Sequence, residues 1–191
     1  FDALYVPDHP GTVASPFVAL AAAAAVTDRI ELGTCVANAG VWEPMRLADE
    51  AATLHAMSGG RALLGVGAGH TPAEWTATGR TQPPPRERVD RLIELVDTTG
   101  GLLAGGPVNH RGAHFTLVDA VIAEPPGARG EDVPVMVGGN GARVLEYGGR
   151  VADRVGLSGL GRTLADGHQH EVAWRPADLD RTIECVRGAA D

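Results

Sequence analysis

The sequence predicts an α/β protein in which helices cover a parallel sheet. Strand-like apolar runs alternate with segments of helical periodicity, and this pair recurs five times along the 191 residues. Parallel strands need long crossover connections, which are usually helical. A hydrophobic content of 44% and a net charge of −8 are typical of a soluble globular protein. We therefore expect a single α/β domain that spans residues 1–191.

The predicted elements follow one another as a strand and then a helix. The first helix begins after Ser15, a favourable N-cap residue, with a proline at its first position. The second helix has apolar residues at helical spacing and ends at the pair Gly59-Gly60. The predicted strands are 1–9, 30–39, 61–69, 133–141 and 154–159, and the predicted helices are 15–29, 43–60, 86–105, 142–153 and 176–190.

The alternation stops between Gly106 and Pro134. This stretch is rich in turn-forming residues and contains one strand-like run, 113–122, so we expect an insertion at about 107–133. Five strands suit an open doubly wound sheet, whereas a closed eight-stranded barrel needs ~200 residues or more. The residues alone leave an open sheet and a partial barrel as alternatives. The chain opens on Phe1 inside a predicted strand, as if a preceding strand and helix were missing.

Composition argues against several classes of function. The longest apolar run, 18–26, is too short to cross a bilayer, which takes ~20 residues. All sixteen basic residues are scattered arginines, so we expect no nucleic-acid partner. The two cysteines, Cys35 and Cys185, lie far apart and fit a reducing, cytoplasmic compartment. No pattern with metal-ligand spacing and no serine-hydrolase motif occurs.

The expected ligand site lies at the carboxyl ends of the strands, where the strand-to-helix loops of parallel α/β proteins gather. Glycines at such ends let the backbone approach a flat ring or a phosphate, and the alternative is that they only form tight turns. The run 138–141 precedes a helix that starts without acidic side chains, which is typical of an anion site at a helix N-terminus. The strand ends are Asp8 and His9, then 34–38, 67–70, 138–141 and 158–159.

Two of the seven histidines lie at these strand ends. His9 and His70 should face the same mouth of the sheet, where either can act as a general acid or base. His55 lies within a helical stripe and is expected to pack in the core. His110 and His114 lie in loop-like stretches and are expected to be solvated.

Several stretches resemble successive blocks of the bacterial luciferase-like monooxygenase superfamily. They include "FDALYVPDH", "LADEAATLHAMSGGRALLGVGAGH" with "EW" shortly after it, and "VPVMVGGNGARVLEYGGRVAD". The resemblance is greatest to the actinobacterial branch of coenzyme F420-dependent oxidoreductases, and it runs in family order from residue 1 to about residue 158.

The resemblance implies a (β/α)8 TIM barrel of the luciferase-like type, with a flavin or deazaflavin across the carboxyl ends of the strands. Residues 1–9 then correspond to the second strand, so the first strand and the last strands are expected to be missing. Family members have a non-proline cis peptide at the end of the third strand, where a bulge backs the cofactor ring. Here that position is the Cys35-Val36 bond.

The resemblance also implies roles for individual residues. Asp8 and His9 match a strand-end pair whose histidine lies near the substrate, and Asn38 matches a polar contact to the deazaflavin ring. Some F420 enzymes have a carboxylate proton donor at the position of His70, so the proton donor stays open. The remaining matches are Gly67, Gly69 and His70 for the loop along the other edge of the ring, and Gly138, Gly139, Asn140 and Gly141 for the phosphate of the cofactor tail.

The function that this resemblance implies is F420-dependent hydride transfer between C5 of the deazaflavin and a small organic substrate, with a homodimer as a possible assembly. One alternative is an FMN-dependent monooxygenase of the same superfamily. Another, of a different class, is a non-catalytic subunit that binds a flavin or a phosphate.

Overall fold

The computed structural model describes residues 1–157, 160–163, 170–172 and 175–190, and its centre is a parallel sheet. The spatial order is β1-β2-β4-β7-β8, and β3 pairs with the carboxyl-terminal end of β4. Every neighbouring pair in this sheet is parallel, as predicted. The strands are β1 (Ala3–Val6), β2 (Glu31–Thr34), β3 (Ala37–Asn38), β4 (Ala62–Gly67), β7 (Val135–Gly138) and β8 (Arg154–Gly156).

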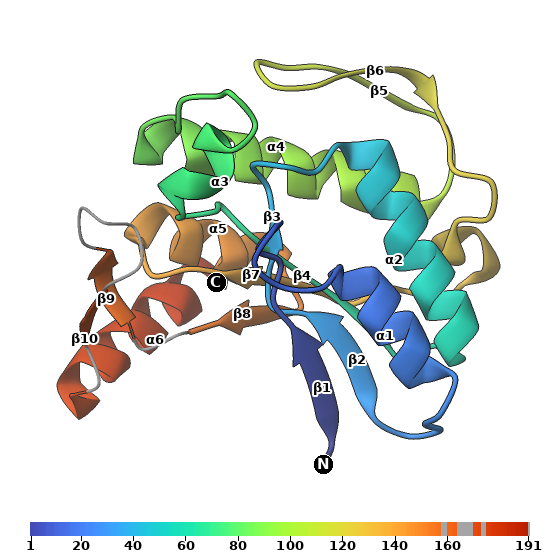
Figure 1. The fold of residues 1–191 in the computed structure, drawn as a ribbon, viewed down its shortest axis with the longest axis horizontal. Helices are drawn as coiled ribbons and strands as arrows, with labels where there is room; N and C mark the ends of the chain where they lie inside the picture. Colours follow the sequence, from blue (N-terminus) through green and yellow to red (C-terminus); the bar gives the residue numbers. More distant parts are fainter. Residues whose placement is uncertain (158–159, 164–169, 173–174, 191) are drawn as a thin grey trace.

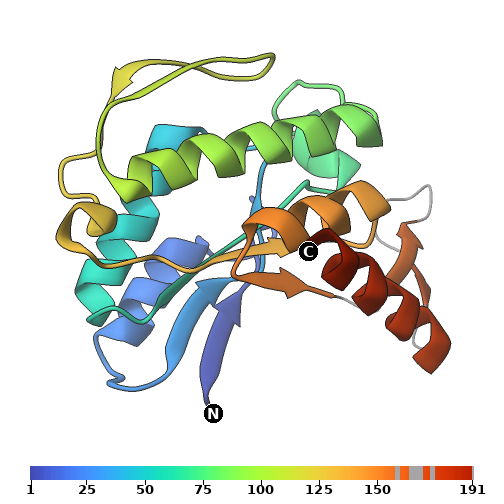
Figure 2. The ribbon, with the colours of Figure 1, turned by 180° about the vertical axis from the view of Figure 1, so that it is seen from behind.

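The helices form an arc around the outside of this sheet in chain order (Figure 1). Four of them begin with a proline, whose missing N–H costs nothing in the first turn of a helix. α5 and α6 lie side by side in both views (Figures 1 and 2). The helices are α1 (Pro16–Ala24), α2 (Pro44–Ser58), α4 (Pro85–Ala104), α5 (Ala142–Val151) and α6 (Pro176–Ala190).

The main hydrophobic core lies between the sheet and these helices. Side chains alternate across a strand, so one face of each strand supplies the core. The strands contribute Leu32, Leu64 and Val137, and the helices contribute residues such as Leu20 and Leu47, all of them at most 2% exposed. His55 is 4% exposed within α2, which confirms that it packs in the interior.

The sheet is curled. This is shown by a side chain of β8 that reaches β2 across the face of the sheet that lies away from the helices. Arg154 Nη1 and Nη2 lie 2.5 and 2.8 Å from the two carboxylate oxygens of Glu31. The Tyr5 hydroxyl on β1 donates to Glu31 Oε1 at 2.6 Å and accepts from Arg154 Nη1 at 3.3 Å. This network bridges over β4 and β7, as in a sheet bent toward a barrel.

The predicted strand 30–39 is interrupted in its middle. Gly33 pairs with Leu63 and Ala37 pairs with Val66. The segment that joins β2 to β3 therefore has one residue more than the stretch of β4 that faces it. Such an extra residue is a β-bulge. Thr34 compensates with its hydroxyl, which donates to Gly65 O at 2.6 Å and accepts from Gly65 N at 3.0 Å.

The predicted insertion contains a hairpin, β5 (Val108–Arg111) and β6 (Thr116–Ala120), and the short helix η1 (Pro126–Arg129). The strand expected at 113–122 is therefore confirmed as β6, and its partner β5 was not predicted. The polar β5 pairs with β6 because α4 holds the hairpin: Glu94 accepts the main-chain N–H groups of His114 and Phe115. His110 and His114 are partly exposed, and His110 also lies 2.9 Å from Glu94 Oε1 through its Nε2.

Three further elements escaped the sequence prediction. They are the short helix α3 (Pro72–Thr76) and the antiparallel strands β9 (Leu160–Thr163) and β10 (His170–Val172). Among the described helices, none combines the length and the apolar character that a membrane span requires.

Candidate active site

The predicted site residues at the ends of β1 and β3 meet in one hydrogen-bonded network. Asp8 follows β1, and its Oδ2 accepts the main-chain N–H of Asn38, the last residue of β3, at 2.9 Å. The same oxygen accepts the indole N–H of Trp42 at 2.7 Å. Asp8 is 6% exposed, so it ties the ends of β1 and β3 together from inside the protein.

Glu74 of α3 is the member of this network that the sequence prediction missed. Its Oε1 lies 2.6 Å from His9 Nδ1, and its Oε2 accepts from Asn38 Nδ2 at 2.5 Å. Glu74 is only 7% exposed, and a buried carboxylate needs such partners. The signal was present in "TPAEW", where Thr71-Pro72 marks a helix start and Trp75 next to Glu74 indicates burial.

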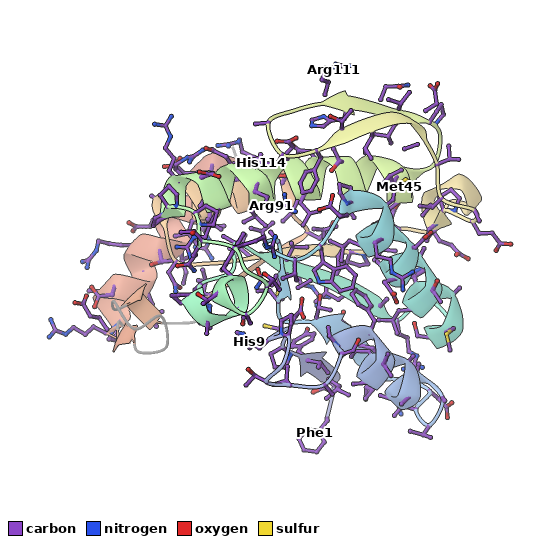
Figure 3. All side chains as sticks on the ribbon, turned by 45° about the horizontal axis from the view of Figure 1, so that its top comes forward. Phe1, His9, Met45, Arg91, Arg111 and His114 are labelled. Atoms are coloured by element: carbon purple, nitrogen blue, oxygen red, sulfur yellow. The ribbon has the colours of Figure 1, made fainter. Side chains whose placement is uncertain are left out.

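His9 is the network member that faces outward. Its side chain is 35% exposed, and it lies beside α3 (Figure 3). Its ring packs edge-to-face against His70, with 5.6 Å between the ring centroids. The contact with Glu74 engages Nδ1, so Nε2 is the ring nitrogen that can exchange a proton with a bound molecule. The two predicted acid/base candidates thus lie together, and Glu74 is the carboxylate partner of His9.

Asn38 is oriented by bonds at both ends of its amide. Its Oδ1 accepts the N–H of Gly40 at 2.8 Å, while its Nδ2 donates to Glu74. The residue is 4% exposed. Its predicted contact with a deazaflavin ring stays a prediction, and the structure shows in addition that Asn38 holds Glu74 in place.

The Cys35-Val36 peptide bond is cis, as the family resemblance implied. Cys35 is exposed at the bulge, whereas the Val36 side chain packs against Gly67 of β4 and Gly138 of β7. A Cβ at Gly138 would lie 2.7 Å from Val36 Cγ1, and a Cβ at Gly67 would collide with Val36 Cγ2. These two glycines are therefore required by Val36, whatever ligand the bulge supports.

Gly69 has a different requirement. Its φ of +70° lies in the left-handed region, and a Cβ there would collide with Asn38 Oδ1. Its carbonyl accepts from Arg88 Nη1 of α4 at 2.9 Å. The loop after β4 is thus shaped to fit against Asn38.

The predicted phosphate cradle at 138–141 leads into α5, whose N-cap is Gly141. Gly139 packs against Val144, whereas a Cβ at Gly141 would meet open space. Arg143 of the same helix is held by Asp90 of α4, with 2.6 Å between Nη2 and Oδ1. Phosphate binding by this segment stays a prediction. The predicted strand end 158–159 lies outside the described residues.

The arrangement is suited to proton transfer. A half-exposed imidazole backed by a buried carboxylate is a group that can accept or donate a proton at Nε2. Within the described ranges, no three His, Cys, Asp or Glu side chains come together in a way that could hold a metal ion.

Comparison with known proteins identifies the family. The model of the family described as luciferase-like monooxygenase matches residues 1–182. The chain belongs to the luciferase-like monooxygenase family. Its relatives within this family include the F420-dependent glucose-6-phosphate dehydrogenase of Kineococcus radiotolerans, which is 35% identical over 200 residues. That alignment covers 96% of this chain and 58% of the relative.

Two further relatives of this luciferase-like chain carry related names. The F420-dependent glucose-6-phosphate dehydrogenase of Amycolatopsis mediterranei is 34% identical, over 83% of this chain and 50% of its own length. A phthiodiolone/phenolphthiodiolone dimycocerosates ketoreductase of Mycobacterium tuberculosis is 32% identical, over 85% of this chain and 38% of its own length. The chain spans about half the length of the curated relatives that it matches.

Solved structures of luciferase-like proteins share the fold. An F420-dependent secondary alcohol dehydrogenase in complex with an F420-acetone adduct superposes with a TM-score of 0.78 at 26% identity, over all of this chain and 57% of its own. The monooxygenase RslO1 of Streptomyces bottropensis has a TM-score of 0.77 at 24% identity, over all of this chain and 55% of its own. The predicted luciferase-like TIM-barrel fold is confirmed. The described parallel strands form a curled sheet that corresponds to part of such a barrel.

Proposed function

We propose that this protein is an F420-dependent oxidoreductase that interconverts an alcohol and a carbonyl compound. The observation that carries the proposal is His9, half-exposed at the strand ends and held through Nδ1 by the buried carboxylate of Glu74. The names of the dehydrogenases and the ketoreductase above share one chemistry, the conversion between C–OH and C=O. That conversion needs one hydride acceptor or donor and one acid/base group.

In alcohol oxidation the hydroxyl proton passes to His9 Nε2, while a hydride leaves the carbon that carries the hydroxyl group. Glu74 holds the proton on Nδ1 and stabilises the imidazolium that forms, as the carboxylate does in other His–carboxylate pairs. Carbonyl reduction is the reverse, with His9 donating the proton. Asn38 and Asp8 keep Glu74 and the end of β1 in place.

The residues at the strand ends fit a planar cofactor with an anionic tail. Cys35 at the bulge and the two imidazoles offer one exposed wall, and Asn140 and Gly141 present exposed backbone just before α5. We infer that the bulge and the loop with Gly69 would hold the ring, and that 138–141 would hold the phosphate of the tail. When bound, F420 supplies the carbon that accepts or donates the hydride.

Parallel equilibrium titrations of the protein with F420 and with FMN, followed by cofactor fluorescence, test the cofactor. We expect saturable binding of F420 and none of FMN at the same concentrations. The reverse result would replace the proposal with an FMN-dependent monooxygenase. Binding of neither cofactor would contradict both readings, whereas F420 binding without turnover of any alcohol would favour a non-catalytic binding subunit.

The variants His9→Asn and His70→Asn separate the two candidate proton donors. We expect His9→Asn to lower kcat roughly 10²-fold or more, because proton transfer by a positioned side chain contributes on this scale. His70→Asn should have a smaller effect, since the buried Glu74 carboxylate that stabilises a protonated imidazole contacts His9 Nδ1. A larger loss in His70→Asn would reverse the assignment.

Both cysteines of the chain are free, which suits a reducing compartment, and we infer a cytoplasmic location. A homodimer stays a prediction that light scattering can test.

A further inference from the structure

A small pocket adjoins the loops that carry the candidate active site. Its volume is about 130 Å³, close to the ~150 Å³ of an engineered cavity that holds a benzene molecule. One wall consists of Gly40, Ala68 and Trp75, which belong to the loops after β3 and β4 and to α3. The pocket is therefore large enough for a phosphate-sized group and too small for a whole cofactor.

The opposite wall is rich in positive charge. Arg80, Arg88 and Arg91 all line the pocket, together with His114 at the tip of the β5–β6 hairpin. Arg91 and His114 lie near each other where the hairpin crosses α4 (Figure 3). Glu87 is the one acidic residue of the lining.

Arg88 has unmet bonding capacity at this wall. Its Nη1 donates to Gly69 O at 2.9 Å, but its buried Nε has no hydrogen-bond partner among the described residues. No ion pair to a carboxylate is found for it among the described residues. Burial also lowers the pKa of Arg88, which reports the cost of keeping its charge away from water. Buried donors without a partner are rare, and a charged one indicates that a bound group supplies the acceptor.

The other two arginines differ in how far they are engaged. Arg91 donates to the carbonyls of Ala39 and Trp42 and pairs with Glu43, so it is largely committed to holding the fold. The guanidinium of Arg80 lies 4.7 Å from the centre of the Trp75 ring, and its Nε donates to Thr78. Arg80 keeps its remaining N–H groups available at the rim of the pocket.

We propose that this pocket binds a phosphate-sized oxyanion, with Arg88 as its main ligand and Arg80 at its rim. Guanidinium groups bind phosphate through paired, charge-assisted hydrogen bonds. An open hollow of about 500 Å³, lined by Pro72, Thr76 and Gln82 among others, shares Arg80 with the pocket. The oxyanion can therefore be free phosphate or the phosphoryl group of an ester whose body lies in the hollow.

This site is separate from the proposed cofactor chemistry, so the two proposals stand or fall independently. It is nevertheless connected to that chemistry, because Arg88 holds the Gly69 carbonyl and Gly69 fits against Asn38. The binding test accordingly uses protein without F420 or FMN.

Isothermal titration calorimetry with inorganic phosphate and with glycerol 3-phosphate, at constant ionic strength, tests the proposal. The variants are Arg88→Gln and, as a matched control, Arg86→Gln, since Arg86 is an exposed arginine on the same helix that does not line the pocket. We expect saturable binding by the native protein and by Arg86→Gln, weakened at least ~10-fold in Arg88→Gln.

Tighter binding of inorganic phosphate supports a free anion, and tighter binding of glycerol 3-phosphate supports an ester. Absence of saturable binding of both, or equal binding by native protein and Arg88→Gln, would overturn the proposal. If Arg88→Gln does not fold, Arg80→Gln replaces it, because Arg80 is exposed. Unchanged binding by Arg80→Gln would then overturn the proposal.

Discussion

The strands carry one polar network at their carboxyl ends and another at their amino ends, and the two differ in burial and in charge balance. At the carboxyl ends, Asp8, Asn38 and Glu74 are 4–7% exposed. At the amino ends, the Arg154 and Glu31 side chains are 46% and 25% exposed. The second network pairs a full positive charge with a carboxylate, whereas the first holds two carboxylates with an amide, an indole and an imidazole.

This difference indicates which network serves stability and which serves chemistry. Exposed ion pairs contribute little and are easily replaced. Buried carboxylates without a cationic partner are costly, and groups of this kind cluster at functional sites. In the described part of the chain, no arginine bonds to Asp8 or Glu74. We therefore expect substitutions at the carboxyl ends to change activity as well as stability, and substitutions at the amino ends to change only stability.

The largest expected effect after that of His9→Asn is that of Glu74→Gln on turnover. Glutamine keeps the size of the side chain and can still accept from Asn38, but it carries no charge to stabilise a protonated His9. We expect kcat/KM with F420 and an alcohol to fall roughly 10²-fold. The pH profile of kcat should change shape as well, which a merely structural defect would not cause. Glu87→Gln on α4 is the control, and equal activity of Glu74→Gln and native protein would refute the role.

A second substitution distinguishes the two carboxylates of the buried network. Asp8→Ala leaves the N–H of Asn38 and the indole N–H of Trp42 without an acceptor. We expect the free energy of unfolding in urea to fall by about 2–3 kcal/mol. Asp8→Asn should lose clearly less, because its carbonyl oxygen can accept both bonds. Equal losses for the two variants would show that the charge of Asp8, rather than its accepting oxygen, is what matters.

A third substitution tests the bulge. In Gly67→Ala the new methyl group collides with Val36 Cγ2, so we expect a loss of about 2 kcal/mol in unfolding free energy and weaker F420 binding. The double variant Gly67→Ala/Val36→Ala should recover part of both. Gly100→Ala is the control, because a Cβ there meets open space on a helix and should stabilise by ~0.5–1 kcal/mol. No recovery in the double variant would contradict the proposed fit.

The smallest expected effect belongs to the amino ends. Arg154→Met removes the partner of Glu31, and we expect a loss of ~0.5–1 kcal/mol in unfolding free energy with F420 affinity unchanged. The Arg154 guanidinium holds the pKa of Glu31 below its usual value. A carboxyl with a lowered pKa stabilises the fold above its unfolded pKa of ~4.3, and that contribution fades as the pH falls through the folded pKa.

The difference between native protein and Arg154→Met, measured by urea unfolding, should therefore be constant at neutral pH and shrink below about pH 4. A difference that persists in acid would mean that Arg154 acts by packing rather than by charge.

The sequence predicted the regular elements well because their signals are local. The apolar periodicity placed α1, α2, α4, α5 and α6, although α1 ends at Ala24 rather than at residue 29. Strand β5 was missed because it is polar and because the hairpin that it forms with β6 is held by a distant residue, Glu94. A short helix such as α3 has too few residues for a periodic signal, and only its Thr-Pro start could have indicated it.

The candidate site was predicted in part for the same reason. Asp8, His9 and Asn38 stand at strand ends that the alternation of elements predicts, and the structure joins them. Glu74 could not be placed, because its position depends on how the loop after β4 folds back toward β1. The glycines at 67 and 138 suggest an open cradle in the sequence, and only the bulge shows that Val36 fills the space between them.

Deuterium transfer is the most direct test of the central claim that His9 and Glu74 serve an F420-dependent alcohol oxidation. The protein is incubated with oxidised F420 and a secondary alcohol deuterated at its carbinol carbon, and the reduced cofactor is analysed by NMR and mass spectrometry. We predict one deuterium at C5 of the reduced deazaflavin, at a rate reduced roughly 10²-fold in Glu74→Gln. Bound F420 that acquires no deuterium from any secondary alcohol, or transfer at the same rate in Glu74→Gln, would contradict the account.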